Sequence, residues 1–116
     1  MPDFVYVIAA RDVPAGQARP AQVGDEWYAV CNDRGTFYVT AFDCPHEHGP
    51  LGQGEVHDGC LVCPVHHWPW DLRTGLTDPN MPYVRLARYA CEVRDGQVYA
   101  DVSRAILPEI GKQSDG

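Results

Sequence analysis

Two short segments of the sequence each place a cysteine shortly before a histidine. The first contains Cys44 and His46 with one residue between them, and the second contains Cys63 and His66 with two residues between them. Residues 47–62 separate the two segments. Thiolate sulfur is a soft metal ligand, and imidazole binds iron and zinc. Two segments that each contain both ligand types can therefore bind a single inorganic centre. The expected chemistry is therefore that of a metal site.

A [2Fe–2S] cluster is one centre that these four side chains can hold. Cys44 and Cys63 would bind one iron, and His46 and His66 would bind the other. Two ferric ions, two sulfides and two thiolates sum to no net charge, and neutral imidazoles add none. A centre with four thiolates would start with two negative charges, so the histidine-containing centre is easier to reduce in a pocket of low dielectric constant. We therefore expect the protein to transfer single electrons.

A zinc site is the alternative reading of the same region. Cys60 and Cys63 form a C-x-x-C pair, which is a common half of a zinc site. With His46 and His66 they could hold one zinc ion. That choice leaves Cys44 without a role, so we favour the cluster.

The remaining histidines and cysteines need an assignment as well. His48 and His67 could replace the nearer histidine of each segment as a ligand. We instead expect the other three histidines to be exposed loop residues: His48, His57 and His67. We expect the other three cysteines to be buried thiols of the core, where a free thiol behaves as a small hydrophobic group: Cys31, Cys60 and Cys91.

The segments CPHEHGPL and CPVHHWPWDLRTG resemble those of the Rieske-type ferredoxins that serve bacterial aromatic-ring oxygenases. The layout of strands before and after the segments also agrees, so the resemblance spans nearly the whole chain. It implies one Rieske [2Fe–2S] cluster per chain with these ligands: Cys44, His46, Cys63 and His66. It also implies that partners dock over the ligand histidines. The chain departs from the family at His67, where glycine is usual.

The surroundings of the cluster motif bear on its reduction potential. In Rieske proteins of the respiratory and photosynthetic complexes, a disulfide joins the two cluster loops and hydroxyl groups donate hydrogen bonds to the cluster sulfurs. Here Gly49 and Val65 hold the disulfide positions, and Trp68 and Trp70 hold the donor positions. We expect neither indole to replace a hydroxyl donor. The predicted potential therefore lies near the lower end of the Rieske range, which runs from about −150 to +300 mV.

Size and charge limit the classes of protein to consider. The chain has 116 residues, which suits one domain, and a formal net charge of −7, which argues against binding nucleic acid or an anionic membrane. The N-terminal segment resembles neither a secretion signal nor a membrane anchor, so we expect a cytoplasmic protein. Five cysteines in a reducing compartment indicate metal ligands and buried thiols rather than disulfides.

The elements that must position the two segments are predicted to be short strands. The sequence contains 11 glycines and 10 prolines spread along its length, which is typical of many strands joined by turns. We predict strands over residues 4–9, 27–31, 37–40, 83–87, 89–94 and 97–102, with turns at 32–35 and 95–96. The predicted fold class is all-β: the Rieske fold, with an antiparallel β-sandwich or barrel as its base.

We expect one domain built from two unequal parts. The smaller cluster-binding subdomain, of loops and short strands, covers about residues 41–79. The base covers about residues 1–40 and 80–107. Residues 108–116 are expected to form a flexible C-terminal tail, preceded by an Ile106-Leu107 pair that packs on the base.

The expected function follows from the resemblance. The chain would be a soluble, monomeric electron carrier that passes single electrons from a flavin-dependent NAD(P)H reductase to a terminal oxygenase, either a dioxygenase or a monooxygenase. The sequence shows no nucleotide-binding fingerprint and no nucleophile arrangement, so we expect no catalysis of its own. Two alternatives stay open: the small Rieske-like subunit of an assimilatory nitrite reductase, and a zinc-stapled binding module.

Overall fold

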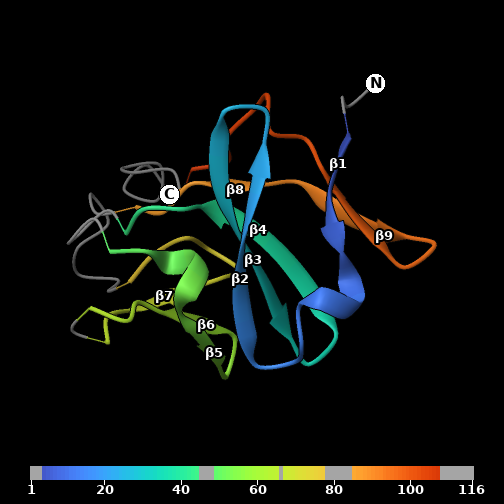
Figure 1. Cartoon of the computed structure of the whole chain (residues 1–116). Helices are drawn as coiled ribbons and strands as arrows, with labels where there is room; N and C mark the ends of the chain where they lie inside the picture. The colour runs from blue at the N-terminus through green and yellow to red at the C-terminus, as the bar shows by residue number, and fades with distance from the viewer. Residues whose placement is uncertain (1–3, 45–48, 66, 78–84, 108–116) are drawn as a thin grey trace, which may run out of the picture.

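The computed structural model describes residues 4–44, 49–65, 67–77 and 85–107 (Figure 1). Within them the chain forms strands and two short 3-10 helices: β1 (Val5–Ala9), η1 (Ala10–Asp12), β2 (Gln17–Val23), β3 (Glu26–Asp33), β4 (Thr36–Ala41), η2 (Leu51–Gln53), β5 (Glu55–His57), β6 (Cys60–Val62), β7 (Pro69–Asp71), β8 (Arg88–Tyr89), β9 (Cys91–Arg94) and β10 (Gln97–Ala100). The expected all-β class is confirmed.

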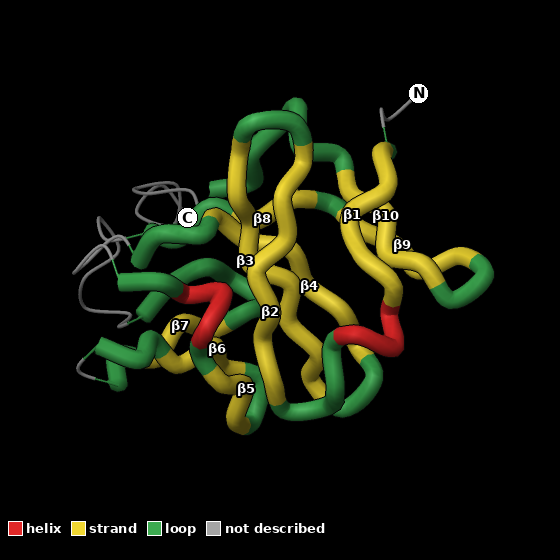
Figure 2. Tube along the Cα trace, viewed as in Figure 1, coloured by secondary structure: helices red, strands yellow, loops and turns green. Residues whose placement is uncertain are grey.

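The strands form two antiparallel sheets (Figure 2). One has the order β1-β10-β9, and the other has the order β7-β6-β5-β2-β3-β4-β8. The larger sheet is nearly divided in two, because β2 and β5 share only the pair Gln17 and Glu55. Figure 1 places β5, β6 and β7 at the opposite end of the molecule from β1 and β9.

Strand β3 is the centre of the fold because both of its faces are buried. Tyr28 and Val30 pack on one side, in a core shared with residues of β1 and β10. Ala29 and Cys31 point to the other side, as alternate residues of a strand must, and pack in a second core. This second core contains the cysteines of both motif segments. A buried strand thus separates the base of the fold from the region of the predicted site.

Several predicted strands are confirmed, and the differences have local causes. The segments predicted at 4–9, 27–31, 37–40 and 97–102 correspond to β1, β3, β4 and β10. Arg34 and Gly35 of the first predicted turn, and Asp95 and Gly96 of the second, all have positive φ angles, as a two-residue hairpin turn requires. The segment predicted at 89–94 is interrupted at Ala90, which separates β8 from β9.

Strand β2 was not predicted from the sequence, and Pro20 lies within it. A proline has no N–H to donate and therefore argues against an inner strand. Here Pro20 pairs with Ala29 of β3 on one side. On the other side β5 reaches β2 only at Gln17, so among the described strands none needs a hydrogen bond from Pro20.

Two predictions near the C-terminus were only partly right. Leu86 and Ala87, expected in a strand, lie outside the regular strands, although Arg85 just before them bridges Leu76. The predicted residues 83 and 84 and the predicted tail 108–116 lie outside the described residues. Ile106 does not pack as expected: its backbone bridges Arg88, and its side chain is 38% exposed.

The described residues include no helix with the length and apolar character needed to cross a bilayer.

The side chain of Asn32 offers a test of the base of the fold. Its amide donates to the Val13 carbonyl and its oxygen accepts from the Gly35 N–H, each at 2.7 Å. We expect Asn32→Ala to lower the free energy of unfolding by about 2 kcal/mol, because the carbonyl of the buried Val13 loses its donor and the turn at Gly35 loses the bond that closes it. Urea unfolding measures this loss. Gln22→Ala, in the exposed part of β2, is the control and should change the midpoint little; equal effects would contradict the assignment.

Candidate metal centre

The two ends of the first motif segment, Cys44 and Gly49, are joined by backbone contacts, and we refer to residues 44–49 as the first loop. Asp43 and Pro50 form an antiparallel bridge on either side of it. Inside this bridge, the N–H of Cys44 donates to the carbonyl of Gly49 at 2.9 Å. The cysteine is therefore the first residue of the loop, and its backbone is fixed by the strand pairing that precedes it.

The two ends of the second motif segment, Cys63 and Trp68, are joined in the same way, and we refer to residues 63–68 as the second loop. Val62 and Pro69 pair across it as the last residue of β6 and the first of β7. The N–H of Cys63 donates to the carbonyl of Trp68 at 2.9 Å. In both loops the cysteine N–H thus bonds to the carbonyl five residues later, just inside an antiparallel pair. The two segments that resemble each other in sequence therefore also share the same backbone contacts at their ends.

The two loops contact each other through their cysteines. Cys44 and Cys63 are both completely buried in one core. A Cβ added to Gly49 of the first loop would lie 2.7 Å from the Cys63 sulfur and 3.0 Å from a methyl of Val65. In the opposite direction, the indole nitrogen of Trp70 donates to the Cys44 sulfur at 3.4 Å. Two buried cysteines in one core, one against Gly49 of the first loop and the other against Trp70 beside the second, fit the thiolate half of an iron–sulfur site.

A turn after the second loop fixes the position of Trp70. The carbonyl of Asp71 accepts the N–H groups of Thr74 and Gly75, and the carboxylate of Asp71 accepts the N–H of Arg73 at 2.8 Å. Gly75 has a φ of 84°, a conformation that glycine adopts without steric cost. The sequence segment after the aromatic residue is therefore a closed turn, and it anchors the strand that carries Trp70.

Trp70 corrects one expectation about the site. We expected no indole to replace a hydroxyl donor at the cluster, whereas the N–H of Trp70 points at a motif cysteine. The side chain of Trp70 is completely buried in the same core as Cys44, which agrees with its expected covering role. Trp68 packs partly buried against that core.

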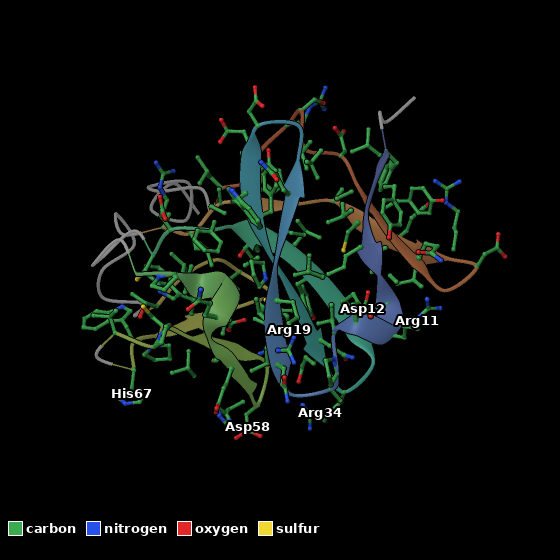
Figure 3. All side chains as sticks on the ribbon, viewed as in Figure 1. Arg11, Asp12, Arg19, Arg34, Asp58 and His67 are labelled. Carbon is green, nitrogen blue, oxygen red and sulfur yellow. The ribbon has the colours of Figure 1, made fainter. Side chains whose placement is uncertain are left out.

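The structure describes two of the five histidines, His57 and His67. His46, His48 and His66 lie outside the described residues. His67 is exposed and has a φ of 53°, a left-handed conformation that is costly for any residue other than glycine. Figure 3 shows His67 at the end of the molecule that carries the two loops, far from Arg11 and Asp12. His57 is exposed as expected, and its ring lies 2.8 Å from Glu55.

A recess of about 270 Å³ borders the second loop. Cys63, Pro64 and His67 line it together with His57 and other residues of the β5–β6 hairpin. Among the described residues, no group of three or more His, Cys, Asp and Glu side chains is placed to hold a metal ion. The recess is an opening beside a buried cysteine.

The surroundings of the three other cysteines favour the protonated thiol. Burial raises the pKa of Cys31, and the neighbouring Cys91 raises it further. Burial also raises the pKa values of Cys60 and Cys91, which are only partly buried rather than fully enclosed as expected. A thiol must lose its proton to bind a metal, so these environments disfavour ligation.

The C-x-x-C pair is part of a strand and not a metal-binding turn. Cys60 and Leu61 are consecutive residues of β6 and point to opposite faces. Leu61 and Cys63 are buried in the core, and Cys60 is half-exposed on the other face. This geometry removes the main support for a zinc ion bound by Cys60.

Comparison with known proteins identifies the family. Residues 3–90 match the family model of the Rieske [2Fe–2S] domain. The biphenyl dioxygenase ferredoxin subunit of a Pseudomonas strain is 30% identical over 105 residues, covering 90% of this chain and 96% of that one. The anthranilate 1,2-dioxygenase ferredoxin subunit of Burkholderia cepacia is 40% identical over 87 residues, covering 70% and 66%. The chain belongs to the Rieske [2Fe–2S] family, and its cofactor is a [2Fe–2S] cluster.

A solved structure supports the same assignment. In the complex of reduced oxygenase and oxidized ferredoxin of carbazole 1,9a-dioxygenase, the matching chain superimposes with a TM-score of 0.72 at 28% identity. The match covers 87% of this chain and 94% of that one. The Rieske fold predicted from the sequence is confirmed, and the relatives named as ferredoxin subunits are electron-transfer components rather than catalysts.

Gly49→Ala tests the contact between the two loops. The added methyl group would overlap the Cys63 sulfur, so we expect purified protein to lose most of its iron and acid-labile sulfide. Gly24→Ala is the control: its methyl group would meet nothing within 4 Å, although its φ of 62° makes it mildly destabilising. It should keep the cluster. Full iron content in Gly49→Ala would show that the loops do not meet as described.

His67→Gly tests which histidine of the second loop is a ligand. Glycine relieves the left-handed backbone, so we expect the variant to keep its iron and to gain about 1 kcal/mol in free energy of unfolding. Arg34→Gly is a matched control, since Arg34 has a φ of 51° in a turn outside the loops. Both variants should move the urea midpoint in the same direction. Loss of iron from His67→Gly alone would make His67 a ligand.

Proposed function

We propose that this chain is a single-electron carrier whose cluster is bound by Cys44 and Cys63 at one iron and by His46 and His66 at the other. The cluster supplies reversible one-electron reduction, while the protein holds the ligands and excludes water. The observation that carries the proposal is the repeated loop base, which buries one cysteine of each loop in a common core.

Several described residues in and beside the two loops support the proposed site. The paired strands at the base of each loop fix the backbone of Cys44 and Cys63, so little conformational freedom is lost when the thiolates bind iron. Gly49 leaves room for the Cys63 sulfur, which a larger residue would displace. Trp70 and Leu61 pair across β6 and β7 and close the core below the sulfurs. Together they keep water from the thiolate side of the cluster.

Electron exchange is proposed on the side of the cluster away from the buried cysteines. Cys44 and Cys63 lie in the core, so a partner would approach over the segments that contain His46 and His66. Electron-transfer partners form small, short-lived interfaces, because a carrier must release one before meeting the next. The net charge of −7 supports attraction to partners with basic surfaces, at a rate that falls with added salt.

The names of the relatives guide the choice of partners. A chain similar to this one occurs in a complex of an oxygenase with its ferredoxin, and two relatives are ferredoxin subunits of dioxygenases. We propose a terminal oxygenase, of the dioxygenase or monooxygenase type, as the electron acceptor. A flavin-dependent NAD(P)H reductase is the proposed donor. We further propose a cytoplasmic monomer whose cluster-binding subdomain, residues 41–79, is supported by a base of residues 1–40 and 80–107.

The two other candidate functions have less support. The relatives described above are ferredoxin subunits of dioxygenases, which favours a ferredoxin over a nitrite reductase subunit, and the sequence contains both pairs of cysteine and histidine. A zinc module would need Cys60, which is half-exposed on the opposite face of β6 from the core.

The decisive experiment is electron paramagnetic resonance of the protein after anaerobic purification and reduction with dithionite. We expect about two irons and two acid-labile sulfides per chain, and the anisotropic signal of a cluster with nitrogen ligands on one iron. Cys44→Ser and His66→Ala should lose the signal, and Cys31→Ser should keep it. A colourless protein that binds one zinc, or a cluster with four thiolate ligands, would overturn the proposal.

Electron delivery forms a separate prediction. With a flavin reductase and a terminal oxygenase of this class, the wild-type chain should support substrate turnover, and His67→Gly should support it too. The rate at a low concentration of the carrier should fall as salt screens its negative charge. A rate independent of the carrier would exclude its proposed place between the reductase and the oxygenase.

A further inference from the structure

The hydrogen bond from Trp70 to Cys44 connects the two halves of the site. Trp70 belongs to β7, next to the second loop, while Cys44 begins the first loop. The indole nitrogen lies 3.4 Å from the sulfur, within the range for hydrogen bonds to sulfur, and both residues are completely buried. An indole N–H can only donate, so the sulfur must be the acceptor.

The fold fixes the direction of this bond. Trp70 pairs with Leu61 across β6 and β7, and the turn at Asp71 holds the strand from the other side. A hydroxyl group can rotate toward another acceptor, whereas the indole N–H moves only with its ring. In a closely packed core the ring has one position, so the donor is held on the sulfur.

We infer that Trp70 is a positioning residue that acts through Cys44 to make the cluster easier to reduce. This inference rests on the proposed function, since it takes Cys44 as a ligand. The electron that enters adds one negative charge to the cluster, and part of that charge lies on the ligand sulfurs. A donor to sulfur stabilises the reduced state more than the oxidised state, because hydrogen bonds strengthen as the acceptor becomes more negative.

The inference changes the expected reduction potential. The sequence alone suggested a site with few donors and hence a potential near the bottom of the Rieske range. The buried indole supplies a donor that never ionises, in a region from which water is excluded and where electrostatic interactions are strong. The potential of the wild-type protein should therefore lie above that of the same protein without this N–H.

Trp70→Phe tests the inference because it keeps an aromatic ring and removes the N–H. We expect the equilibrium constant for reduction to fall at least tenfold, which is a shift of the midpoint by 59 mV to more negative values for one electron. Voltammetry of the loaded protein measures it. Leu72→Val is the control, because Leu72 is buried in the same core and carries no polar group. It should change the constant less than twofold while lowering stability.

A second measurement separates a direct bond from a packing effect. Trp27 and Trp68 are replaced by Phe, and Trp70 is labelled with ¹⁵N at its indole nitrogen. Pulsed electron paramagnetic resonance of the reduced protein should detect coupling between this nitrogen and the cluster spin. The measurement needs only the tryptophan-containing protein, so it decides the matter even where Trp70→Phe fails to bind iron. An absence of coupling would place the indole nitrogen away from the cluster sulfur and would contradict the bond.

The outcomes distinguish this inference from the proposed function. A loaded Trp70→Phe protein with an unchanged midpoint, or labelled protein without nitrogen coupling, overturns the inference and leaves the carrier role intact. Wild-type protein without an iron–sulfur signal overturns the carrier role and the inference with it. A lowered midpoint together with nitrogen coupling supports the role of Trp70.

Discussion

The structure depends on a reciprocal contact between two loops that are far apart in the sequence. Gly49 of the first loop leaves space for the sulfur of Cys63, and Trp70 beside the second loop donates to the sulfur of Cys44. Either contact alone would position one cysteine. Together they place both sulfurs in one core, and a well-packed position for each sulfur lowers the entropy cost of forming the site.

The sheet beneath the two loops supports this contact with a buried strand and with small side chains. Strand β3 is buried on both faces, and toward the loops it and β2 present small side chains: Ala18, Ala29 and Cys31. Small residues let the large ring of Trp70 and the two loop cysteines lie close to the sheet. The opposite face of β3 carries larger residues, which join the two sheets into the base.

Residue type and spacing predicted Cys44 and Cys63 as metal ligands, because ligation requires particular atoms in a particular order. The structure buries both cysteines in one core, and their role as ligands stays a prediction. Type and spacing could not reveal the role of Trp70, which depends on the pairing of β6 with β7 and on the turn that follows. Strand β2, which contains Pro20, was also missed. The proline is tolerated there because β5 pairs with β2 only at Gln17, and this pairing depends on the tertiary structure. The positive φ of His67 could not be predicted from the residue type. The one indication in the sequence is that the family usually has glycine at this position.

A buried redox site has to satisfy two charge states with one arrangement of side chains. The proposed ligand set makes the oxidised cluster neutral, so its burial needs no compensating cation. The reduced cluster carries one negative charge, which a dry core would disfavour. A fixed dipole suits both states better than a charged side chain would, because it costs little when the site is neutral and stabilises the site when it is charged. The indole of Trp70 meets this requirement, and its large apolar ring also fills the core that keeps water out.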